Sequence, residues 1–373
     1  MPHKIQTKLT TIRKTRGLGA AELAQRIGVT RQTIYAIEAG TYVPNTEVAL
    51  KLARELEVTV EELFSLPGDR EDVSSAITAE YLGQTAPATG QAVRVSRIGN
   101  KWIGVPVDAR PYHLPEADAV VTGSDSRVRK ARLRTFSEDP RLQNKIVLAG
   151  CDPATSLLSN MVERLSGVEI VHAPASSQLA LSWLKDEKVH VAGSHLQDSG
   201  SGEYNLPFIR RQFPNRDMTV VTFARWEEGF VVASGNSKHI RKIEDLARKN
   251  VTFMNREPGS GSRALADRLI DEAGISPKKI EGHDRVALGH LSAAHAVLSG
   301  VADCCIATRS AAQTFGLDFI PLRSEQYDFI LDRDTLRLAA VQALFDALQR
   351  ATLRRKLETL AGYDTSQTGV VRA

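Results

Sequence analysis

The sequence predicts a multidomain protein with three successive parts: an all-α domain, a small β-rich connector and a two-lobed α/β domain. Three observations support this fold class. The chain has 373 residues, whereas a single core stops growing near about 250 to 300 residues. Apolar residues recur at helical spacing up to residue 66, with no competing strand pattern. From residue 144 onward, short apolar strands alternate with helical segments, as in an open parallel sheet.

The first domain is expected to hold five short helices between Ile5 and Phe64. Their ends are marked in the sequence: Gly28 ends the second helix, and Thr59 with Glu62 forms a capping box before the fifth. These signals place the all-α domain at residues 1–66.

Residues 21–40, AELAQRIGVTRQTIYAIEAG, resemble the helix-turn-helix of the Xre and lambda-repressor-like family. The positions that match the family's spacing are a small residue, a turn glycine, two core residues and a glutamate, at Ala24, Gly28, Ile34, Ile37 and Glu38. A small side chain lets two helices approach closely, and glycine permits the left-handed turn between them. The resemblance implies DNA binding by the helix that Thr30 caps.

In that arrangement Arg31, Gln32 and Tyr35 project from the first turns of the recognition helix toward the major groove. Arginine pairs with guanine and glutamine with adenine. The alternative is that these residues form an ordinary solvated helix face. The predicted DNA-contacting residues are Ala20, Thr30, Arg31, Gln32, Thr33 and Tyr35.

The charge of the first domain predicts a homodimer. Its nine lysines and arginines up to residue 68 face seven glutamates, an excess of two. This excess is small for phosphate contact, so one domain is expected to bind DNA weakly. Two half-sites about 34 Å apart, read by a dimer, would compensate.

A linker is predicted at 67–90, where Gly, Pro, Ser, Thr and Ala dominate, and a short helix is compatible with 76–82. The alternation around Gly99-Asn100 then predicts a hairpin within a β-rich connector at 91–143. The basic run 127–134 has two interpretations, a second DNA-contacting surface or the solvent face of an edge strand.

The α/β domain shows strand-helix alternation in two blocks, which predicts two lobes. Lobe I is expected at 144–232 and 326–366, and lobe II at 233–325. In such sheets, ligands bind beyond the carboxyl ends of the strands. The loops at those ends are small and polar in both blocks.

The segments GCDPATSLL, HVAGSHLQD and NREPGSGSR resemble the type 2 periplasmic-binding-protein fold, in the cytoplasmic form attached to a helix-turn-helix. The resemblance covers roughly residues 90–366 and is to regulators often associated with molybdate or molybdenum-cofactor metabolism. It implies a two-lobed clamp that closes on a small ligand.

The loop NREPGSGSR, residues 255–263, indicates an anion rather than a nucleotide. A P-loop requires a lysine before its final Ser or Thr, and none is present. A dinucleotide turn does not tolerate the insertion 255–258 between the strand and the first glycine. We expect Ser260, Ser262 and Arg263, with neighbouring amides, to hold an oxyanion. The alternative is a plain helix entry with Arg263 facing solvent.

Three further candidates lie near the predicted cleft, and two of them have open alternatives. His195 is either a ligand contact or a buried histidine satisfied by backbone, His290 either faces the cleft or caps its helix, and Tyr327 is placed to close over the ligand. The predicted ligand-binding residues are Asp152, Thr155, Ser156, Ser176, Ser177, Ser194, His195, Gly259, Ser260, Gly261, Ser262, Arg263, His290 and Tyr327.

No enzyme, cofactor or metal site is expected. The sequence lacks HExxH and CxxC motifs, a recognisable nucleophile-base pair and an acidic cluster suited to a catalytic metal. Cys304 and Cys305 lie in the apolar run ADCCIA and are interpreted as buried structural thiols. The favoured function is a one-component transcription regulator. The alternatives are an enzyme of molybdenum-cofactor chemistry with a DNA-binding module and a DNA-bound scaffold that recruits a protein.

The expected location is the cytoplasm, because the N-terminus lacks the apolar core of a signal peptide. No apolar run approaches the about 18 to 20 residues that span a bilayer, so no membrane partner is expected. The net charge of +4 permits an acidic partner without requiring one. The expected partners are operator DNA, a small anionic ligand and a second copy of the chain.

Overall fold

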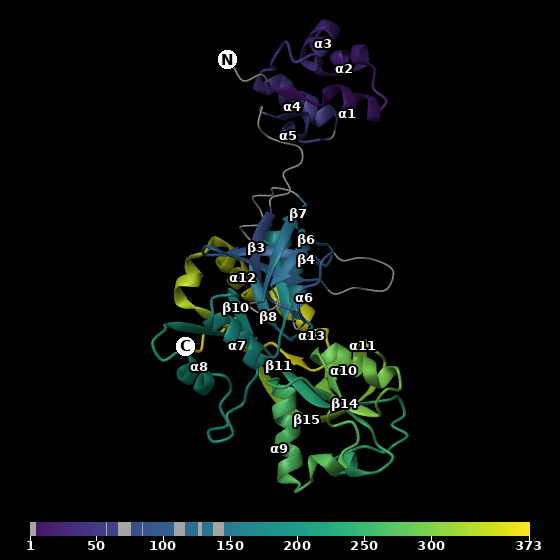
Figure 1. Cartoon of the computed structure of the whole chain (residues 1–373), viewed down its shortest axis with the longest axis vertical. Helices are drawn as coiled ribbons and strands as arrows, with labels where there is room; N and C mark the ends of the chain where they lie inside the picture. The colour runs from purple at the N-terminus through teal and green to yellow at the C-terminus, as the bar shows by residue number, and fades with distance from the viewer. Residues whose placement is uncertain are drawn as a thin grey trace. The chain divides into compact units, whose positions relative to one another are not determined.

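A computed structural model of the chain describes residues 5–56, 58–65, 76–83, 85–107, 116–125, 129–136 and 145–373. The chain forms two compact units, Met1–Val73 and Ser74–Ala373 (Figure 1). Among the described residues, no helix is both long enough and apolar enough to cross a membrane.

The first unit contains the five predicted helices. They are α1 (Leu9–Thr15), α2 (Ala20–Ile27), α3 (Arg31–Glu38), α4 (Thr46–Glu55) and α5 (Val60–Leu63). A two-stranded ribbon of β1 (Gln6–Thr7) and β2 (Phe64–Ser65), which the apolar spacing did not predict, joins the two ends of the unit. Gly28 ends α2 in the left-handed conformation, with φ of 75°, so the turn between α2 and α3 forms as predicted.

Local hydrogen bonds fix the recognition helix α3 in the first unit. The Thr30 hydroxyl accepts from the Thr33 amide at 3.1 Å and caps the helix as predicted. At the other end of α3, Glu38 accepts from Arg13 Nε at 2.8 Å, and both side chains are nearly buried. The side chain of Glu62, half of the predicted capping box, lies outside the described residues.

A closed barrel opens the second unit. It consists of β3 (Ala76–Tyr81), β4 (Ala92–Ile98), β5 (Lys101–Pro106), β6 (Ala119–Asp125) and β7 (Lys130–Thr135), in the order β3-β5-β4-β6-β7. The predicted hairpin is present, with Ile98 opposite Lys101. The helix considered at 76–82 is wrong: this segment is strand β3, whose Ile77, Ala79 and Tyr81 contribute to the apolar interior. Pairing of this segment with β5 and β7 makes it a strand.

The basic run lies on the outer face of the barrel where it is described. Lys130, Arg132 and Arg134 are exposed on β7 and alternate with buried residues. However, β7 pairs with both β3 and β6, so it is not the edge strand that one interpretation assumed. Arg127 lies outside the described residues.

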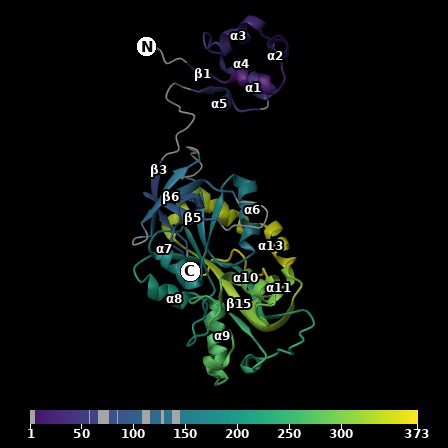
Figure 2. The same ribbon diagram turned by 45° about the vertical axis from the view of Figure 1, so that its right-hand side comes forward.

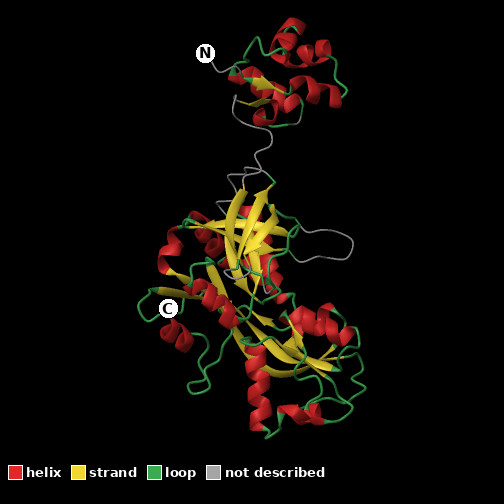
Figure 3. Cartoon of the chain, in the orientation of Figure 1, coloured by secondary structure: helices red, strands yellow, loops and turns green. Residues whose placement is uncertain are grey.

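A large mixed sheet forms the rest of the second unit. Its strands are β8 (Ile146–Gly150), β9 (Ile170–Pro174), β10 (Val191–Ser194), β11 (Met218–Val232), β12 (Phe253–Arg256), β13 (Val286–Ala287), β14 (Cys304–Thr308), β15 (Asp318–Asp332) and β16 (Tyr363–Asp364). Their order is β13-β12-β14-β11-β15-β10-β8-β9, with β16 beside β11. Figure 3 shows this sheet and the barrel as yellow strands.

Two long antiparallel strands, β11 and β15, join the two ends of the sheet. Each has 15 residues. On one side lie β8, β9 and β10, which we call the β8 half, and on the other lie β12, β13 and β14, the β12 half. The register of β11 against β15 shifts twice, between Thr222 and Ala224 and between Glu228 and Gly229. The expected lobe boundaries at 232/233 and 325/326 fall at or within these two strands.

Helices cover both halves of the sheet. They are α6 (Thr155–Ser166), α7 (Ser177–Lys185), α8 (Leu206–Gln212), α9 (Gly261–Glu272), α10 (Gly289–Leu298), α11 (Arg309–Thr314), α12 (Ala339–Leu348) and α13 (Ala351–Glu358), with short 3-10 turns at Ile243–Ala247, Pro277–Lys279 and Arg333–Arg337. Helices α9, α10 and α11 lie at one end of the unit and the barrel at the other (Figures 1 and 2). Each half has its own buried apolar clusters.

Candidate functional site

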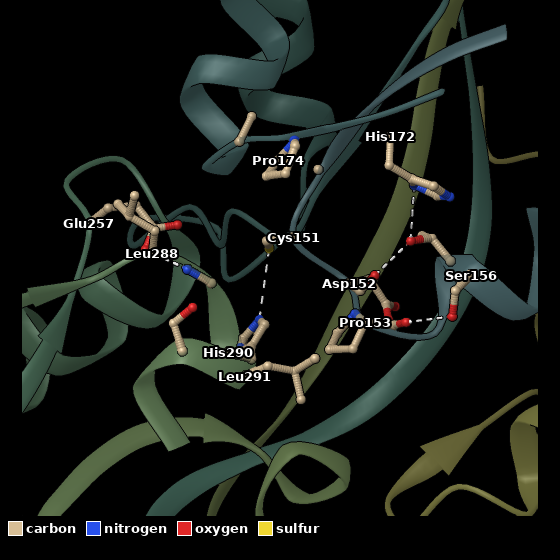
Figure 4. A pocket seen from close by; sticks show the side chains of 15 residues that line it. Cys151, Asp152, Pro153, Ser156, His172, Pro174, Glu257, Leu288, His290 and Leu291 are labelled. Atoms are coloured by element: carbon tan, nitrogen blue, oxygen red, sulfur yellow. Dashed lines mark hydrogen bonds between the residues drawn. The ribbon is translucent and has the colours of Figure 1, made fainter. Parts of the chain in front are cut away.

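A cavity of about 320 Å³ lies between the two halves of the large sheet (Figure 4). The β8 half contributes the end of β8, the start of α6 and the end of β9. The β12 half contributes Glu257 and the start of α10. The residues that line the cavity are Gly150, Cys151, Asp152, Pro153, Thr155, Ser156, His172, Pro174, Ala175, Glu257, Leu288, Gly289, His290, Leu291 and Ser292. The cavity therefore lies at the carboxyl ends of strands, as predicted for a ligand site.

Two helices direct their first turns to this cavity, and their N-cap residues provide no capping side chain. The N-caps of α6 and α10 are Ala154 and Leu288, and neither makes a side-chain cap hydrogen bond. By contrast, Ser176 caps α7 and Ser260 caps α9. One amide at each start is taken by a carboxylate of the cavity wall, Ala154 by Asp152 and Gly289 by Glu257. Since the first amides of a helix carry partial positive charge, the other amides of these first turns favour an anion in the cavity.

The predicted loop 255–263 has its serines engaged within the protein. The Ser260 hydroxyl accepts from the Arg263 amide at 3.2 Å, and the Ser262 hydroxyl donates to Glu228. The Arg263 guanidinium donates to Asp267 at 2.9 Å, one turn further along α9. Glu257 is the residue of this loop that lines the cavity. Direct ligand contact by the two serines and Arg263 stays a prediction.

Four of the other predicted residues line the cavity: Asp152, Thr155, Ser156 and His290. The remaining ones do not line it, and all of them except Gly259 are buried. The Ser177 hydroxyl accepts from the His195 amide at 3.2 Å, and the Tyr327 hydroxyl accepts from the Cys151 amide at 3.3 Å. Ser176 and Ser194 are also buried. Gly259 and Gly261 lie where the halves touch: the Gly259 carbonyl accepts from the Gln178 amide at 3.1 Å.

Asp152 is held in place behind the cavity. Its Oδ1 accepts from the Ala154 amide and from the Tyr363 hydroxyl, both at 2.7 Å, while Oδ2 has no hydrogen-bond partner among the described residues. Burial raises the pKa of Asp152 to about 7. This carboxyl group in the wall of the cavity therefore titrates near neutral pH.

Cys151 and His290 line the cavity and meet the buried His195 behind its wall, although the three residues are far apart in sequence. Cys151 Sγ lies 3.6 Å from His195 Nε2 and 3.8 Å from His290 Nε2. The other ring nitrogens face buried carboxylates: His195 Nδ1 lies 3.5 Å from Glu325, and His290 Nδ1 lies 3.9 Å from Glu228. The three residues come from both halves, with His290 in the first turn of α10.

The pKa values of the two histidines in this cluster are shifted in opposite directions. Burial by itself lowers the pKa of His195, but the neighbouring Cys151 and Glu325 outweigh it and raise this pKa well above the ordinary value. Burial lowers the pKa of His290, and the positive charges of Arg256 and His195 add to that effect. Burial raises the pKa of Glu228 to about 7.

A buried ion pair continues the polar network into the β12 half. Arg256, at the end of β12, donates from Nε and Nη2 to Glu257 at 2.9 and 3.0 Å. Its Nη1 donates to Ser262 at 3.2 Å, and Ser262 donates to Glu228. The Gly289 amide donates to Glu257 at 3.3 Å. This network links the wall of the cavity to the start of α9.

The predicted ligand-binding residues did not include Cys151, Glu228, Arg256, Glu257 or Glu325, although Cys151 and Glu257 belong to polar loops that the sequence places at strand ends. Cys151 directly precedes Asp152, and Arg256 belongs to the loop 255–263. Their positions directly after or at the end of a strand could therefore have indicated that they lie at the site. Glu228 and Glu325 lie within the long strands β11 and β15, where the strand pattern alone does not distinguish a buried carboxylate. Cys304 and Cys305 are buried, as predicted, and burial raises the pKa of both thiols.

The predicted DNA-contacting face of the first unit is mostly exposed. Arg31 and Gln32 are exposed, and Tyr35 is 44% exposed. The Arg31 guanidinium donates from Nη2 to the Tyr35 hydroxyl at 2.8 Å and lies over the Tyr35 ring. Thr33 lies next to Thr30, with their hydroxyls 2.8 Å apart, whereas Ala20 is buried at the start of α2.

The fold and the cavity define a class of protein in which a helix-turn-helix unit is joined to an α/β ligand-binding clamp. The chain belongs to the PBP superfamily domain family, whose model matches residues 158–349. A helix-turn-helix model matches residues 9–63.

Two relatives match different parts of the chain. YvgK of Bacillus subtilis, an uncharacterized protein, is 30% identical over 233 residues, which make up 62% of this chain and 75% of YvgK. An uncharacterized HTH-type transcriptional regulator of Methanothermobacter thermautotrophicus is 44% identical over 66 residues, 17% of this chain and 96% of that protein.

Solved structures to which the chain is similar include two proteins of transporters. A putative phosphate transporter substrate-binding protein of Clostridium perfringens is 10% identical, with a TM-score of 0.44, and covers 58% of this chain and 97% of its own. A tungstate transporter protein of Geobacter sulfurreducens is 13% identical, with a TM-score of 0.44, and covers 58% of this chain and 98% of its own. No conclusion about the ligand of this chain follows from them.

Proposed function

We propose that this protein is a cytoplasmic DNA-binding transcription regulator whose PBP-like domain closes on a small anionic ligand. The observation that carries the proposal is the presence, on one chain, of a capped recognition helix with an exposed Arg31-Gln32 face and a cavity between two halves of a clamp. The first feature serves to bind DNA, and the second serves to detect a small molecule.

The starts of α6 and α10 support an anion as the ligand. They lie on opposite halves, so an anion between them would be attracted to both and would favour the closed clamp. The residues proposed to contact it are Asp152, Thr155, Ser156 and His290, with Ser292 at the rim. Within this frame, molybdate, tungstate and a molybdenum-cofactor-related metabolite are the first candidates.

Closure is proposed to occur between lobe I, at 144–232 and 326–366, and lobe II, at 233–325, by bending of β11 and β15. In a homodimer, such bending would change the separation of the two recognition helices. A ligand changes DNA affinity only through its different affinity for the two states of the clamp. We propose binding without turnover as the role of the cavity.

The experiment has two parts, both on the full chain. Thermal melting is measured with molybdate, tungstate, sulfate, phosphate, small carboxylates and molybdopterin precursors. DNA affinity is then measured with and without the stabilising ligand, on sequences selected from random oligonucleotides. We expect at least one anion to raise the melting temperature and to change the DNA affinity.

The variant Ser292→Asp tests whether the anion occupies the cavity. Ser292 lies in the first turn of α10 and lines the cavity. An aspartate there suits the start of a helix but repels a bound anion. We expect the anion-induced shift to vanish in Ser292→Asp and to persist in Ser237→Asp, at an exposed serine outside the cavity lining. An equal shift in both variants would contradict the proposed site.

A further inference from the structure

The Cys151, His195 and His290 side chains have the arrangement of a transition-metal site. One thiol sulfur and two imidazole nitrogens lie within 4.8 Å of one another. In tetrahedral zinc sites, the metal lies about 2.3 Å from sulfur and about 2.0 to 2.1 Å from nitrogen, so sulfur and nitrogen are about 3.6 Å apart. The observed separations of Cys151 Sγ from the two Nε2 atoms are 3.6 and 3.8 Å.

The surroundings of the two imidazoles match those of metal ligands. A histidine that binds a metal through one ring nitrogen usually directs the other toward a carboxylate or a carbonyl, which fixes the ring and its tautomer. His195 Nδ1 lies 3.5 Å from Glu325, and His290 Nδ1 lies 3.9 Å from Glu228. Neither nitrogen makes a hydrogen bond among the described residues, so each carboxylate is a near neighbour of its ring. Both histidines and both glutamates are buried. The same arrangement therefore occurs twice around one sulfur atom.

The site also has an open side. Cys151 and His290 line the cavity, so a fourth ligand would come from there (Figure 4). Three protein ligands with one open position are typical of metal sites that bind a further molecule. Among the described residues, the cavity lining contains neither lysine nor arginine. A bound cation would supply the positive charge that an anionic ligand requires.

We propose that Cys151, His195 and His290 bind one divalent transition-metal ion of the zinc class, and that its open coordination position receives the anionic ligand. This proposal deepens the proposed function, and its second part rests on that function. Since Cys151 and His195 lie in the β8 half and His290 in the β12 half, the ion joins the two halves and stabilises the closed clamp. Thiolate and imidazole ligands together favour zinc, cobalt or copper over calcium or magnesium.

A second interpretation of the same atoms is a nucleophilic cysteine. In space, the Cys151 sulfur contacts His195, and His195 lies next to Glu325. This is the arrangement of a nucleophile, its base and a carboxylate that orients the base. A nucleophile of this kind needs one imidazole, however, and here a second imidazole with its own carboxylate approaches the same sulfur. The second histidine is the reason for favouring a metal.

The test uses the full chain after treatment with a chelator, and Co²⁺ as the probe. We expect one equivalent of Co²⁺ to produce a thiolate-to-cobalt charge-transfer band and to quench the fluorescence of Trp226. The Trp226 ring centroid lies 5.2 and 5.6 Å from those of His195 and His290. Zn²⁺ should abolish the band by competition and should protect Cys151 from iodoacetamide.

Variants identify the ligands. Cys151→Ser changes one partly buried atom and is expected to fold, as melting will show, but to lose the band entirely. His290→Gln should weaken Co²⁺ binding at least tenfold. Cys304→Ser, at a buried thiol of β14, is the matched control and should keep the band. No band in the wild-type chain, a band in Cys151→Ser, or alkylation of Cys151 that Zn²⁺ does not slow would each overturn the metal site.

The anion panel, run with and without Zn²⁺, separates the two proposals. An anion shift that requires Zn²⁺ supports both. A cobalt band without any anion shift or DNA response retains the metal site and overturns the proposed ligand and its coupling to DNA. An anion shift in chelator that Zn²⁺ does not alter, with no cobalt band, retains the proposed function and overturns the metal site.

Discussion

His195 packs directly against Gly261, so that a β-carbon on Gly261 would overlap the His195 imidazole ring and backbone. His195 follows β10 in the β8 half, and Gly261 is the first residue of α9 in the β12 half. The close approach of the two halves therefore depends on a position without a side chain. The two halves are also joined near this point by the hydrogen bond from the Gln178 amide to the Gly259 carbonyl, at 3.1 Å.

The first prediction is that Gly261→Ala opposes closure. The added methyl group must displace His195 or separate the halves, at a cost of about 1 to 3 kcal/mol. We expect the calorimetric unfolding transition of the second unit to shift to lower temperature. Gly200→Ala, where the nearest atom would be Asp198 Oδ2 at 3.5 Å, is the control. Equal unfolding temperatures of the two variants would contradict the prediction, because the added methyl group would then be accommodated without loss of stability.

The second prediction concerns Arg31 on the recognition helix. The Tyr35 hydroxyl holds the Arg31 guanidinium through two hydrogen bonds, at 3.1 and 2.8 Å. Tyr35→Phe removes these bonds and should weaken binding to selected DNA by about threefold to tenfold, the value of one net hydrogen bond. Arg31→Ala should cost about 1 to 3 kcal/mol.

Fluorescence anisotropy on single variants and the double variant tests this coupling. In the Arg31→Ala background, Tyr35→Phe should have no further effect, because the hydroxyl then has no arginine to hold. Additive losses of affinity would mean that Tyr35 contacts DNA on its own account.

The third prediction concerns the ion pair between Arg13 and Glu38. Both side chains are nearly buried, with exposed fractions of 10% and 8%, and Arg13 Nη1 also donates to the Leu18 carbonyl at 2.7 Å. Glu38→Gln leaves a buried cation without its counter-charge and should destabilise the first unit by about 3 kcal/mol. Chemical denaturation, followed by the circular dichroism of the helices, measures the loss in the free energy of unfolding. Glu47→Gln, at an exposed pair with Lys51, should change little.

The fourth prediction concerns pH. Burial lowers the pKa of His190 to about 4, and His190 Nδ1 accepts from the Val147 amide at 2.9 Å, which a protonated ring cannot do. Because the folded pKa lies below the unfolded value of about 6.5, the stabilising contribution is present above pH 6.5. It is lost as pH falls through about 4, and amounts to roughly 3 kcal/mol between pH 7 and pH 4.

His190→Asn keeps an acceptor for the Val147 amide but cannot titrate. The free energy of unfolding of this variant should therefore fall less steeply from pH 7 to pH 4 than that of the wild type. His239→Asn, at an exposed histidine, is the matched control. A slope for His190→Asn as steep as that of the wild type would contradict the assignment. Burial also lowers the pKa of His172 to about 4. Part of the pH dependence of the unfolding free energy should therefore remain in every variant.

The first unit could be predicted from the sequence because its signals are local. Helical spacing, the Thr30 cap and the Gly28 turn each act over a few residues, and all three are present as predicted. The strand-helix alternation of the second unit is equally local. The segment at 76–82 shows the limit, since its short period-two pattern competes with a helix until its partner strands are known.

The cavity and its residues were only partly predictable. Local position after a strand was enough to select Asp152, Thr155, Ser156 and His290, which line it. The same reasoning selected Ser260 and Arg263. In the structure, however, the Ser260 hydroxyl caps α9 and the Arg263 guanidinium pairs with Asp267. Such polar groups form hydrogen bonds with partners close in sequence, which a strand-end pattern does not reveal.

The sequence by itself determined the order of the domains, the recognition helix and the strand ends at which a ligand can bind, because each depends on neighbours within a few turns. Only the tertiary structure decided that Cys151, His195 and His290 share one point, since 44 and 95 residues separate them along the chain. Their meeting depends on the order of strands in the sheet and on the contact of its two halves, which no local pattern encodes. The carboxylates behind the histidines depend on the same long-range packing of β11 and β15.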